Sequence, residues 1–434
     1  EEAASKGIAL KGIMLGSHGL FTWGDTSYSS YINTLDVIEK CAEYLESNYK
    51  NVFGGPNPKV VQKSADEIKS IASKIAPTLR GYCSSERNMI GHFSADSRVL
   101  EFINSNDLAR LAPLGTSCPD HFLRTKISPL VLELAPNEDL TDVEAIKAKL
   151  TPAFEAYRVM YSDYYNACKK SNSPAMRDPN PVVILYPGVG MFTFAKDKTM
   201  ARLASEYYIN AVNVMKGAEA VSEYTSLPHQ EAFDIEYWLL EEAKLQRMPK
   251  PKALSGRIAL ITGSAGGIGK AIAKKFAEEG ACVIINDINV ERLEGATADF
   301  TKVFGRDAVS STLLNVTDEK STELAMDAAC LAFGGVDIVI NNAGISISKS
   351  IAEHTLEEWD RLYDILVKGQ FIVSKAGVEV MRKQGFGGDL VNIVSKNAVV
   401  AGPNNPGYGS AKAAQAHLTR LMAAELGADK IRVN

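Results

Sequence analysis

The C-terminal half of the chain alternates between short apolar runs and amphipathic stretches. The runs are rich in β-branched residues, and we predict a strand at each of 257–262, 282–287, 308–316, 336–344 and 389–395. Helical spacing of apolar residues fills the intervals, over 267–280, 289–304, 318–333, 355–384 and 408–426. Almost wholly apolar strands that alternate with helices are typical of a parallel sheet covered on both faces. The pattern therefore predicts a doubly wound α/β domain.

The N-terminal half is less regular, and we predict an α/β fold there as well. Residues 29–48 have the spacing of an amphipathic helix, and another helix is predicted at about 198–216. The apolar stretch 181–195 is interpreted as one buried strand that runs into a glycine-containing loop. No internal repeat is apparent in the sequence.

A stretch with two prolines, a basic cluster and few large apolar residues separates the halves, as a linker would. We therefore divide the chain into four parts: 1–50, 51–240, the linker 241–256, and 257–434. Because the last residues read as the start of a strand, and because the chain begins without Met, we expect an interior piece of a longer polypeptide.

The composition is that of a globular protein with room for sizeable cores. The chain has 434 residues, of which 46% are hydrophobic and 23% charged. A net charge of −5 gives no general attraction to nucleic acid or to an anionic membrane, and no apolar run reaches the ~18 residues that a transmembrane helix needs. Six cysteines without a C-x-x-C pair fit a reducing, cytoplasmic compartment.

The segment TGSAGGIG (262–269) follows a predicted strand and opens a predicted helix. Gly263 permits a tight turn, Gly267 lets the backbone approach a pyrophosphate, and Gly269 lets helix and sheet pack closely. Asp287 ends the next strand, where a carboxylate accepts hydrogen bonds from ribose hydroxyls and repels a 2′-phosphate, which favours NAD over NADP. An ordinary loop at 262–269, and an Asp287 that only caps the following helix, are the structural alternatives.

Tyr408 and Lys412 lie four residues apart at the start of a predicted helix, and Ser395 comes thirteen residues before the tyrosine. A tyrosine needs a lowered pKa to act as an acid–base group near neutral pH, and an adjacent ammonium supplies it. A serine hydroxyl can hold a substrate oxygen. Such a Tyr-Lys pair alone is more often a surface pair, but the glycine-rich turn, Asp287 and NNAG (341–344) make coincidence improbable.

With these motifs, residues 257–434 resemble a short-chain dehydrogenase/reductase with a Rossmann-type sheet. The resemblance implies that Tyr408 transfers the proton, Lys412 lowers its pKa and holds the nicotinamide ribose, and Ser395 polarises the substrate carbonyl. It also implies further NAD contacts at Ile268, Asn315, Val316, Asn342, Ala343 and Gly344. One position departs from the family: Leu366 stands where an Asn usually supports a water relay to the lysine, and Asn397 is a candidate substitute.

The segment SHGLFTWGDT (17–26) resembles part of the class II aldolases, the zinc-dependent sugar-phosphate aldolase/adducin family. That resemblance implies that His18 is one of three zinc-binding histidines, the other two lying in an H-x-H upstream. Because the chain contains no H-x-H, we expect this piece to hold little zinc on His18 alone. A satisfied structural histidine is the alternative.

The order of the motifs along the whole chain resembles the bifunctional rhamnulose-1-phosphate aldolase/alcohol dehydrogenase family. That resemblance implies cleavage of rhamnulose 1-phosphate in one half and NAD-dependent action on lactaldehyde in the other. Two alternatives stay open. The aldolase could be the main activity with a minor dehydrogenase, or the dehydrogenase half could be a non-catalytic NAD-binding scaffold.

Two further segments and the quaternary structure complete the expectations. The loop 187–198 is a candidate phosphate site with Lys196 or Lys198, against the alternative of a solvated turn. In 116–126, Cys118 and His121 are a conceivable nucleophilic pair, although a buried cluster beside a helix is favoured. We expect a small-molecule substrate and a homo-oligomer that pairs through 355–384 and 408–426.

Overall fold

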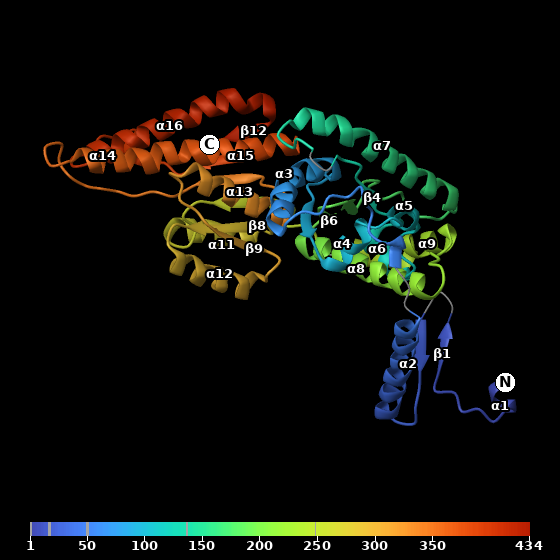
Figure 1. Cartoon of the computed structure of the whole chain (residues 1–434). Helices are drawn as coiled ribbons and strands as arrows, with labels where there is room; N and C mark the ends of the chain where they lie inside the picture. Colours follow the sequence, from blue (N-terminus) through green and yellow to red (C-terminus); the bar gives the residue numbers. More distant parts are fainter. Residues whose placement is uncertain (1, 16–18, 49–51, 136–137, 248) are drawn as a thin grey trace.

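The computed structural model describes residues 2–15, 19–48, 52–135, 138–247 and 249–434. It comprises an N-terminal arm, a middle α/β domain and a C-terminal α/β domain (Figure 1). No helix within these described ranges is long and apolar enough to cross a membrane. The arm consists of α1 (Glu2–Ser5), β1 (Gly12–Leu15), β2 (Gly19–Thr22) and α2 (Ser27–Ser47).

The middle domain carries mixed elements around a small sheet. In chain order they are α3 (Ala65–Cys83), β3 (Ile90–Ser94), α4 (Ser97–Ile103), α5 (Leu108–Leu111), α6 (Phe122–Thr125), β4 (Leu130–Val131), α7 (Val143–Cys168), β5 (Val183–Tyr186), β6 (Gly190–Ala195), α8 (Lys198–Val221), α9 (His229–Glu236) and α10 (Leu239–Gln246). Since α10 ends at Gln246, the stretch predicted as a linker begins inside a helix.

The C-terminal domain alternates strands and helices as the periodicity predicts. In chain order they are β7 (Ile258–Ile261), α11 (Gly267–Glu278), β8 (Cys282–Asp287), α12 (Val290–Phe304), β9 (Val309–Leu313), α13 (Glu319–Phe333), β10 (Ile338–Asn341), α14 (Leu356–Tyr363), α15 (Gly369–Gln384), β11 (Gly388–Asn392), α16 (Pro406–Leu426) and β12 (Ile431–Val433). The predicted helical zone 355–384 thus contains two α-helices, which a π-helical turn joins at Asp364–Lys368.

The six strands of the C-terminal domain form one parallel sheet in the order β12-β11-β10-β7-β8-β9. The strand order reverses between β7 and β10, and ligands of open α/β sheets bind in the crevice beyond the carboxyl ends of strands at such a point. The central strands β7 and β10 are buried along their whole length, which explains their continuous apolar runs. The predicted doubly wound fold is confirmed.

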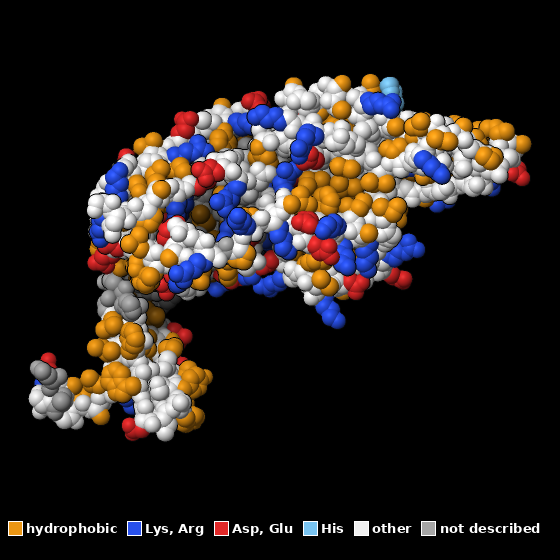
Figure 2. All heavy atoms as spheres, turned by 180° about the vertical axis from the view of Figure 1, so that it is seen from behind, with side chains coloured by type: hydrophobic (Ala, Val, Ile, Leu, Met, Phe, Trp, Pro, Cys, Tyr) orange, Lys and Arg blue, Asp and Glu red, His pale blue; other side chains and the backbone are white. Residues whose placement is uncertain are grey.

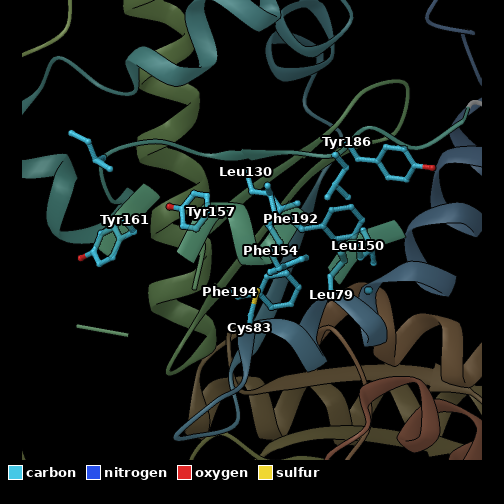
Figure 3. Close-up of a cluster of buried hydrophobic side chains, with 14 of the residues drawn as sticks. Leu79, Cys83, Leu130, Leu150, Phe154, Tyr157, Tyr161, Tyr186, Phe192 and Phe194 are labelled. Atoms are coloured by element: carbon cyan, nitrogen blue, oxygen red, sulfur yellow. The ribbon is translucent and has the colours of Figure 1, made fainter. Parts of the chain in front are cut away.

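The middle domain has a four-stranded sheet in the order β3-β6-β5-β4. Its core packs α3 and α7 against this sheet through side chains such as Leu79, Phe154 and Phe192, which converge in the close-up of Figure 3. The prediction of a buried strand that runs into a glycine-containing loop over 181–195 holds for β5 and the turn after it, but it missed the second strand, β6. The chain turns between Tyr186 and Gly190, so that β5 and β6 form an antiparallel hairpin, and a continuous apolar run cannot reveal such a hairpin.

The hairpin of the arm and the hairpin of the middle domain share one architecture. In each, two antiparallel strands lead through an N-cap residue into a helix of 21 residues or more: β1, β2 and α2 in the arm, and β5, β6 and α8 in the middle domain. Gly12 pairs with Thr22 as Val183 pairs with Thr193, a constant offset of 171 residues. We name these two units the arm copy and the middle copy. The expectation of no internal repeat was wrong.

The two copies repeat individual hydrogen bonds at the same offset. Thr22 and Thr193 donate their hydroxyls to the carbonyls of Ser30 and Ala201, at 3.5 and 2.6 Å. The N-cap side chains of Thr26 and Asp197 each accept from the backbone N–H three residues later. Both second strands begin with a glycine in a conformation that side chains disfavour, at φ 152° and 150°. The repeat is therefore one of backbone geometry as well as of element order.

Burial differs sharply between the copies. Ile13 and Phe21 of the arm copy are 49% and 50% exposed, whereas their counterparts Ile184 and Phe192 are 0% and 1% exposed. The difference arises because α3 and α7 pack on the face of the β5–β6 hairpin that carries Ile184 and Phe192. Hydrophobic side chains accordingly cover much of the arm surface in Figure 2.

The middle and C-terminal domains join through a fully buried ion pair. Arg80 of α3 donates two parallel hydrogen bonds to the carboxylate of Asp337, at 2.7 and 2.8 Å, and both side chains are 0% exposed. The remaining guanidinium donors reach the Gln384 side chain and the carbonyls of Gly256 and Met89. Complete pairing is the condition under which a buried charge is tolerated, since its desolvation is costly.

A second set of contacts holds the other side of this interface. Arg202 of α8 binds the Asp307 carboxylate at 2.9 Å, and the Lys198 ammonium donates to the Ala332 carbonyl and contacts His92 Nδ1 at 2.8 Å. Burial lowers the pKa of Lys198 to about 8. Lys198 is thus neither a phosphate ligand nor part of a solvated turn, because its amine is committed to the domain interface.

We predict that Arg80→Met lowers the free energy of unfolding by about 3–5 kcal/mol, since it leaves the Asp337 carboxylate buried without its cation. Urea unfolding followed by circular dichroism measures the change. The control is Arg98→Met, which removes the surface pair with Asp96 and should cost less than about 1 kcal/mol. Equal unfolding midpoints for the two variants would contradict a stabilising role for the buried pair.

Candidate functional site

The glycine-rich turn lies between β7 and α11, at the point where the strand order reverses. Gly263 and Gly267 have φ of 63° and 52°, a region that favours glycine. A Cβ on Gly267 would meet no atom within 4 Å, so the backbone there faces open space that a ligand could approach. A Cβ on Gly269 would lie 2.5 Å from the Gly263 carbonyl oxygen, which accounts for close packing of helix and turn.

The NNAG segment (341–344) at the end of β10 is hydrogen-bonded to the residue that begins this turn. The Thr262 hydroxyl accepts hydrogen bonds from the backbone N–H groups of Asn342 and Ala343, each at 2.8 Å. The Asn342 amide in turn donates to the Thr262 carbonyl at 2.9 Å. The NNAG segment is therefore fixed to the glycine-rich turn, and the predicted cofactor residues of the two segments lie together.

A cavity of about 510 Å³ opens over these segments. Nine of the residues predicted to contact a dinucleotide line it: Gly263, Gly267, Ile268, Asp287, Asn315, Val316, Asn342, Ala343 and Gly344. Gly269 packs beneath it. Several lining residues, among them Arg292, were not predicted from the sequence. Arg292 lies on α12, five residues after Asp287, and this closeness in sequence to a predicted cofactor residue could have identified it.

The polar groups of this cavity fit a dinucleotide. A backbone that faces open space at Gly266 and Gly267, at the start of α11, offers N–H groups to a pyrophosphate. Asp287 Oδ1 accepts from the Asn289 backbone N–H at 3.0 Å, which orients the carboxylate at the end of β8. The Asn315 side chain accepts from Thr317 instead, so it holds the local turn.

Ser395, Tyr408 and Lys412 come from two neighbouring elements, the loop after β11 and the first turns of α16. The Lys412 Nζ donates to the Ile393 carbonyl at 2.8 Å and lies 5.8 Å from the centre of the Tyr408 ring. The Ser395 hydroxyl accepts from the Asn397 backbone N–H at 3.2 Å. Ser395 therefore lies three residues beyond the end of β11, whereas the sequence pattern placed it on the strand.

Burial lowers the pKa of Lys412 to about 8. The lysine is 5% exposed, and its ammonium has the Ile393 carbonyl as a neutral partner. Its charge is therefore lost within the range of pH at which enzymes are assayed, which makes the charge state of Lys412 measurable through activity.

Leu366 lies in the π-helical turn between α14 and α15 and is fully buried. A Cβ on Gly344 would lie 2.9 Å from Leu366 Cδ2, so the leucine packs directly behind the NNAG segment. It belongs to a small apolar cluster with Leu362 and Ala411, against which Tyr408 also packs. Leu366 thus supports the site by packing where a polar side chain was expected. π-helical turns are frequent at functional sites.

A second cavity of about 550 Å³ lies beside the first turns of α16. It is lined by the loop 397–406 and by Gly409, Ser410 and Ala413 of α16, together with Ser350 and Ile351. Apolar side chains such as Val399 and Val400 are 83% and 62% exposed at its edge. Asn397, the candidate substitute for the missing Asn at position 366, lines this cavity.

Within the part of the N-terminal half that the structure describes, the candidate residues do not form a comparable centre. His18 lies outside the described residues, and no group of three or more His, Cys, Asp or Glu in the described ranges could hold a metal ion. The His121 ring is buried, lies 3.3 Å from the Thr116 hydroxyl and packs on Tyr207. The segment 116–126 is therefore a packed cluster beside a short helix.

Two family models match the chain. The model described as "Aldolase class II, second domain" matches residues 70–245, and the model described as "short chain dehydrogenase" matches residues 257–434. The 3-oxoacyl-[acyl-carrier-protein] reductase FabG of Thermotoga maritima is 35% identical over 181 residues, covering 42% of this chain and 72% of that protein. The chain belongs to the short-chain dehydrogenase family. In this chain, the dehydrogenase domain is fused to a class II aldolase second domain.

One relative resembles nearly the whole chain. The uncharacterized oxidoreductase YuxG of Bacillus subtilis is 36% identical over 424 residues, which cover 97% of this chain. The chain spans 61% of the length of YuxG. Among solved structures, a gluconate 5-dehydrogenase from Burkholderia cenocepacia in complex with NADP and tartrate is 32% identical, with a TM-score of 0.39 over 41% of this chain and 69% of that one.

We predict that kcat/KM for carbonyl reduction falls as the pH rises through about 8, because the Lys412 ammonium is lost there. A pH profile from about 6 to 10 measures the fall. In Lys412→Arg the cation persists throughout this range, so the fall near pH 8 should disappear even if the activity is lower. An unchanged fall in Lys412→Arg would show that another group titrates.

Proposed function

We propose that the chain carries an NAD-dependent alcohol or aldehyde dehydrogenase that acts on a small hydroxyaldehyde such as lactaldehyde. The observation that carries the proposal is the placement of Lys412 Nζ 5.8 Å from the centre of the Tyr408 ring on α16, next to the loop that holds Ser395, in the domain whose glycine-rich turn opens onto a cavity. The cavity at the glycine-rich turn contains Asp287 and would hold the dinucleotide. The short-chain substrate would lie beside Tyr408 and Ser395.

The residues present can divide the reaction among them. NAD, when bound, would supply the hydride acceptor at its nicotinamide ring. The Ser395 hydroxyl holds the substrate oxygen, and the Tyr408 phenol exchanges a proton with that oxygen as hydride leaves or joins its carbon. The Lys412 ammonium favours the phenolate. With an aldehyde, the hydrated gem-diol takes the place of the alcohol, so that loss of hydride and a proton yields the acid.

We infer a zinc-dependent aldolase activity on rhamnulose 1-phosphate for the complete polypeptide. The support is the match to a class II aldolase second domain and the HGLFTWGDT segment that contains His18. Zinc would supply Lewis acid chemistry at the substrate oxygens. Lactaldehyde, the aldehyde such a cleavage releases, is the substrate proposed for the dehydrogenase half. Assembly of chains through α15 and α16, on which Phe371 and Leu421 are 50% and 55% exposed, stays a prediction.

We predict that Tyr408→Phe lowers kcat with lactaldehyde and NAD at least ~10²-fold, because the phenylalanine keeps the ring but cannot exchange the proton. NADH formation at 340 nm measures the loss, and NADH binding by fluorescence should stay within about twofold of wild type. The control is Tyr363→Phe, since that ring stacks on Trp359 in α14. Full activity in Tyr408→Phe would refute the proposed role. Cofactor binding without turnover in the wild type would favour the scaffold alternative.

We predict that Asp287→Ala raises the kcat/KM for NADP relative to NAD at least ~10-fold, because it removes the charge that repels a 2′-phosphate. Steady-state kinetics with the two cofactors measure the ratio. Asp299→Ala, which removes an exposed carboxylate of α12 outside the cavity, is the matched control. A wild-type preference for NADP would overturn the role given to Asp287, and Arg292 in the same cavity would then be the residue to examine.

A further inference from the structure

The middle copy of the hairpin–helix repeat places a turn where the arm copy carries its candidate metal ligand. At the constant offset of 171 residues, His18 corresponds in sequence to Val189. Val189 is 1% exposed and packs in the core of the middle domain, so the middle copy has no imidazole at this position. The equivalent turn is instead marked by Gly188, whose φ of 77° requires a residue without a side chain.

A cavity of about 550 Å³ lies beside this turn. Gly188 lines it, together with the loop 52–56, the segment that includes Lys63, Glu101 of α4, and Asn104, which follows α4. The Asn104 side chain accepts from the Gly188 backbone N–H at 2.7 Å, which ties the turn to the cavity wall. The cavity is thus adjacent to the turn that corresponds to the candidate metal ligand of the first copy.

The chemistry of the lining favours a small oxygen-rich anion. The Lys63 Nζ lies 3.3 Å from the position that a Cβ on Gly188 would occupy, so the ammonium stands directly at the turn. Gln62, Ser97 and Asn104 add neutral hydrogen-bonding side chains. The carboxylate of Glu101 is paired at 2.7 Å with Lys216, which reduces its repulsion of an anion. An ammonium with amide and hydroxyl groups around it is a set that binds phosphate groups.

We propose that this cavity is a metal-independent binding site for a small phosphorylated hydroxy compound. It would lie in the second aldolase domain at the place equivalent to the metal site of the first. Lys63 binds the phosphate as a point charge, and the amide and hydroxyl side chains contact the polyol part. The site is separate from both dehydrogenase cavities, so its existence does not depend on the dehydrogenase activity proposed above.

Isothermal titration calorimetry on the full chain tests the proposal, with dihydroxyacetone phosphate and inorganic phosphate as probes. EDTA and saturating NAD are present throughout, so that neither a metal centre nor the dinucleotide cavity accounts for binding. We expect the wild type to bind dihydroxyacetone phosphate, and Lys63→Met to weaken binding at least ~10-fold through loss of a charge-assisted contact. Weaker binding of inorganic phosphate would show that the polyol part also contributes, and equal binding would restrict the site to the phosphate.

Two further variants separate a direct role from loss of structure. Glu101→Gln removes the negative charge of the cavity and should tighten binding by about 2- to 5-fold, a gain that a damaged fold cannot give. Lys59→Met removes an exposed lysine of the same loop region outside the cavity and should leave binding unchanged. No binding by the wild type, equal loss in Lys63→Met and Lys59→Met, or loss of binding in His18→Ala would overturn the proposal.

Discussion

The buried pair between Arg80 and Asp337 is the contact on which the arrangement of the two large domains depends. Asp337 immediately precedes β10, and the NNAG segment that lines the dinucleotide cavity ends that same four-residue strand. The Arg80 guanidinium of the middle domain thus neutralises a carboxylate at one end of β10, and the dehydrogenase cavity lies at the other end of that strand. Because neither side chain is exposed, separating the domains would require hydrating both charges. The dehydrogenase domain is therefore stabilised by its neighbour as well as by its own core.

Beneath the dehydrogenase site, polar side chains form a buried hydrogen-bond network. Asn341 donates to the side chains of Ser374 and Asn392, and Asn392 donates to the hydroxyl of Thr419. This buried network links β10, β11, α15 and α16, the elements that also carry the NNAG segment and Lys412. Leu366 is apolar, so rigidity at its position comes from packing, while the network fixes the strands on either side.

Local sequence patterns were sufficient to predict the fold and the cavity of the dehydrogenase domain, but they were insufficient to predict those of the middle domain. Apolar runs and glycine spacing predicted the parallel sheet and the cavity around Gly263 and Asp287, because each depends on neighbours in sequence. The interface lysine Lys198 was not predictable, since its partners His92 and Ala332 lie more than 100 residues away. The repeat was hidden for another reason: the two hairpins share their register and hydrogen bonds but few identical residues, such as the glycine, phenylalanine and threonine of GLFT and GMFT.

The edges of the arm hairpin carry backbone groups that no described strand pairs. Among the described residues, β1 and β2 pair only with each other, and the apolar side chains between them face outward. Unpaired backbone N–H and C=O groups on a flat apolar ribbon are a template for strand addition. A strand added to either edge of this hairpin would pair these groups, as β3 and β4 do at the edges of β6 and β5 in the middle copy.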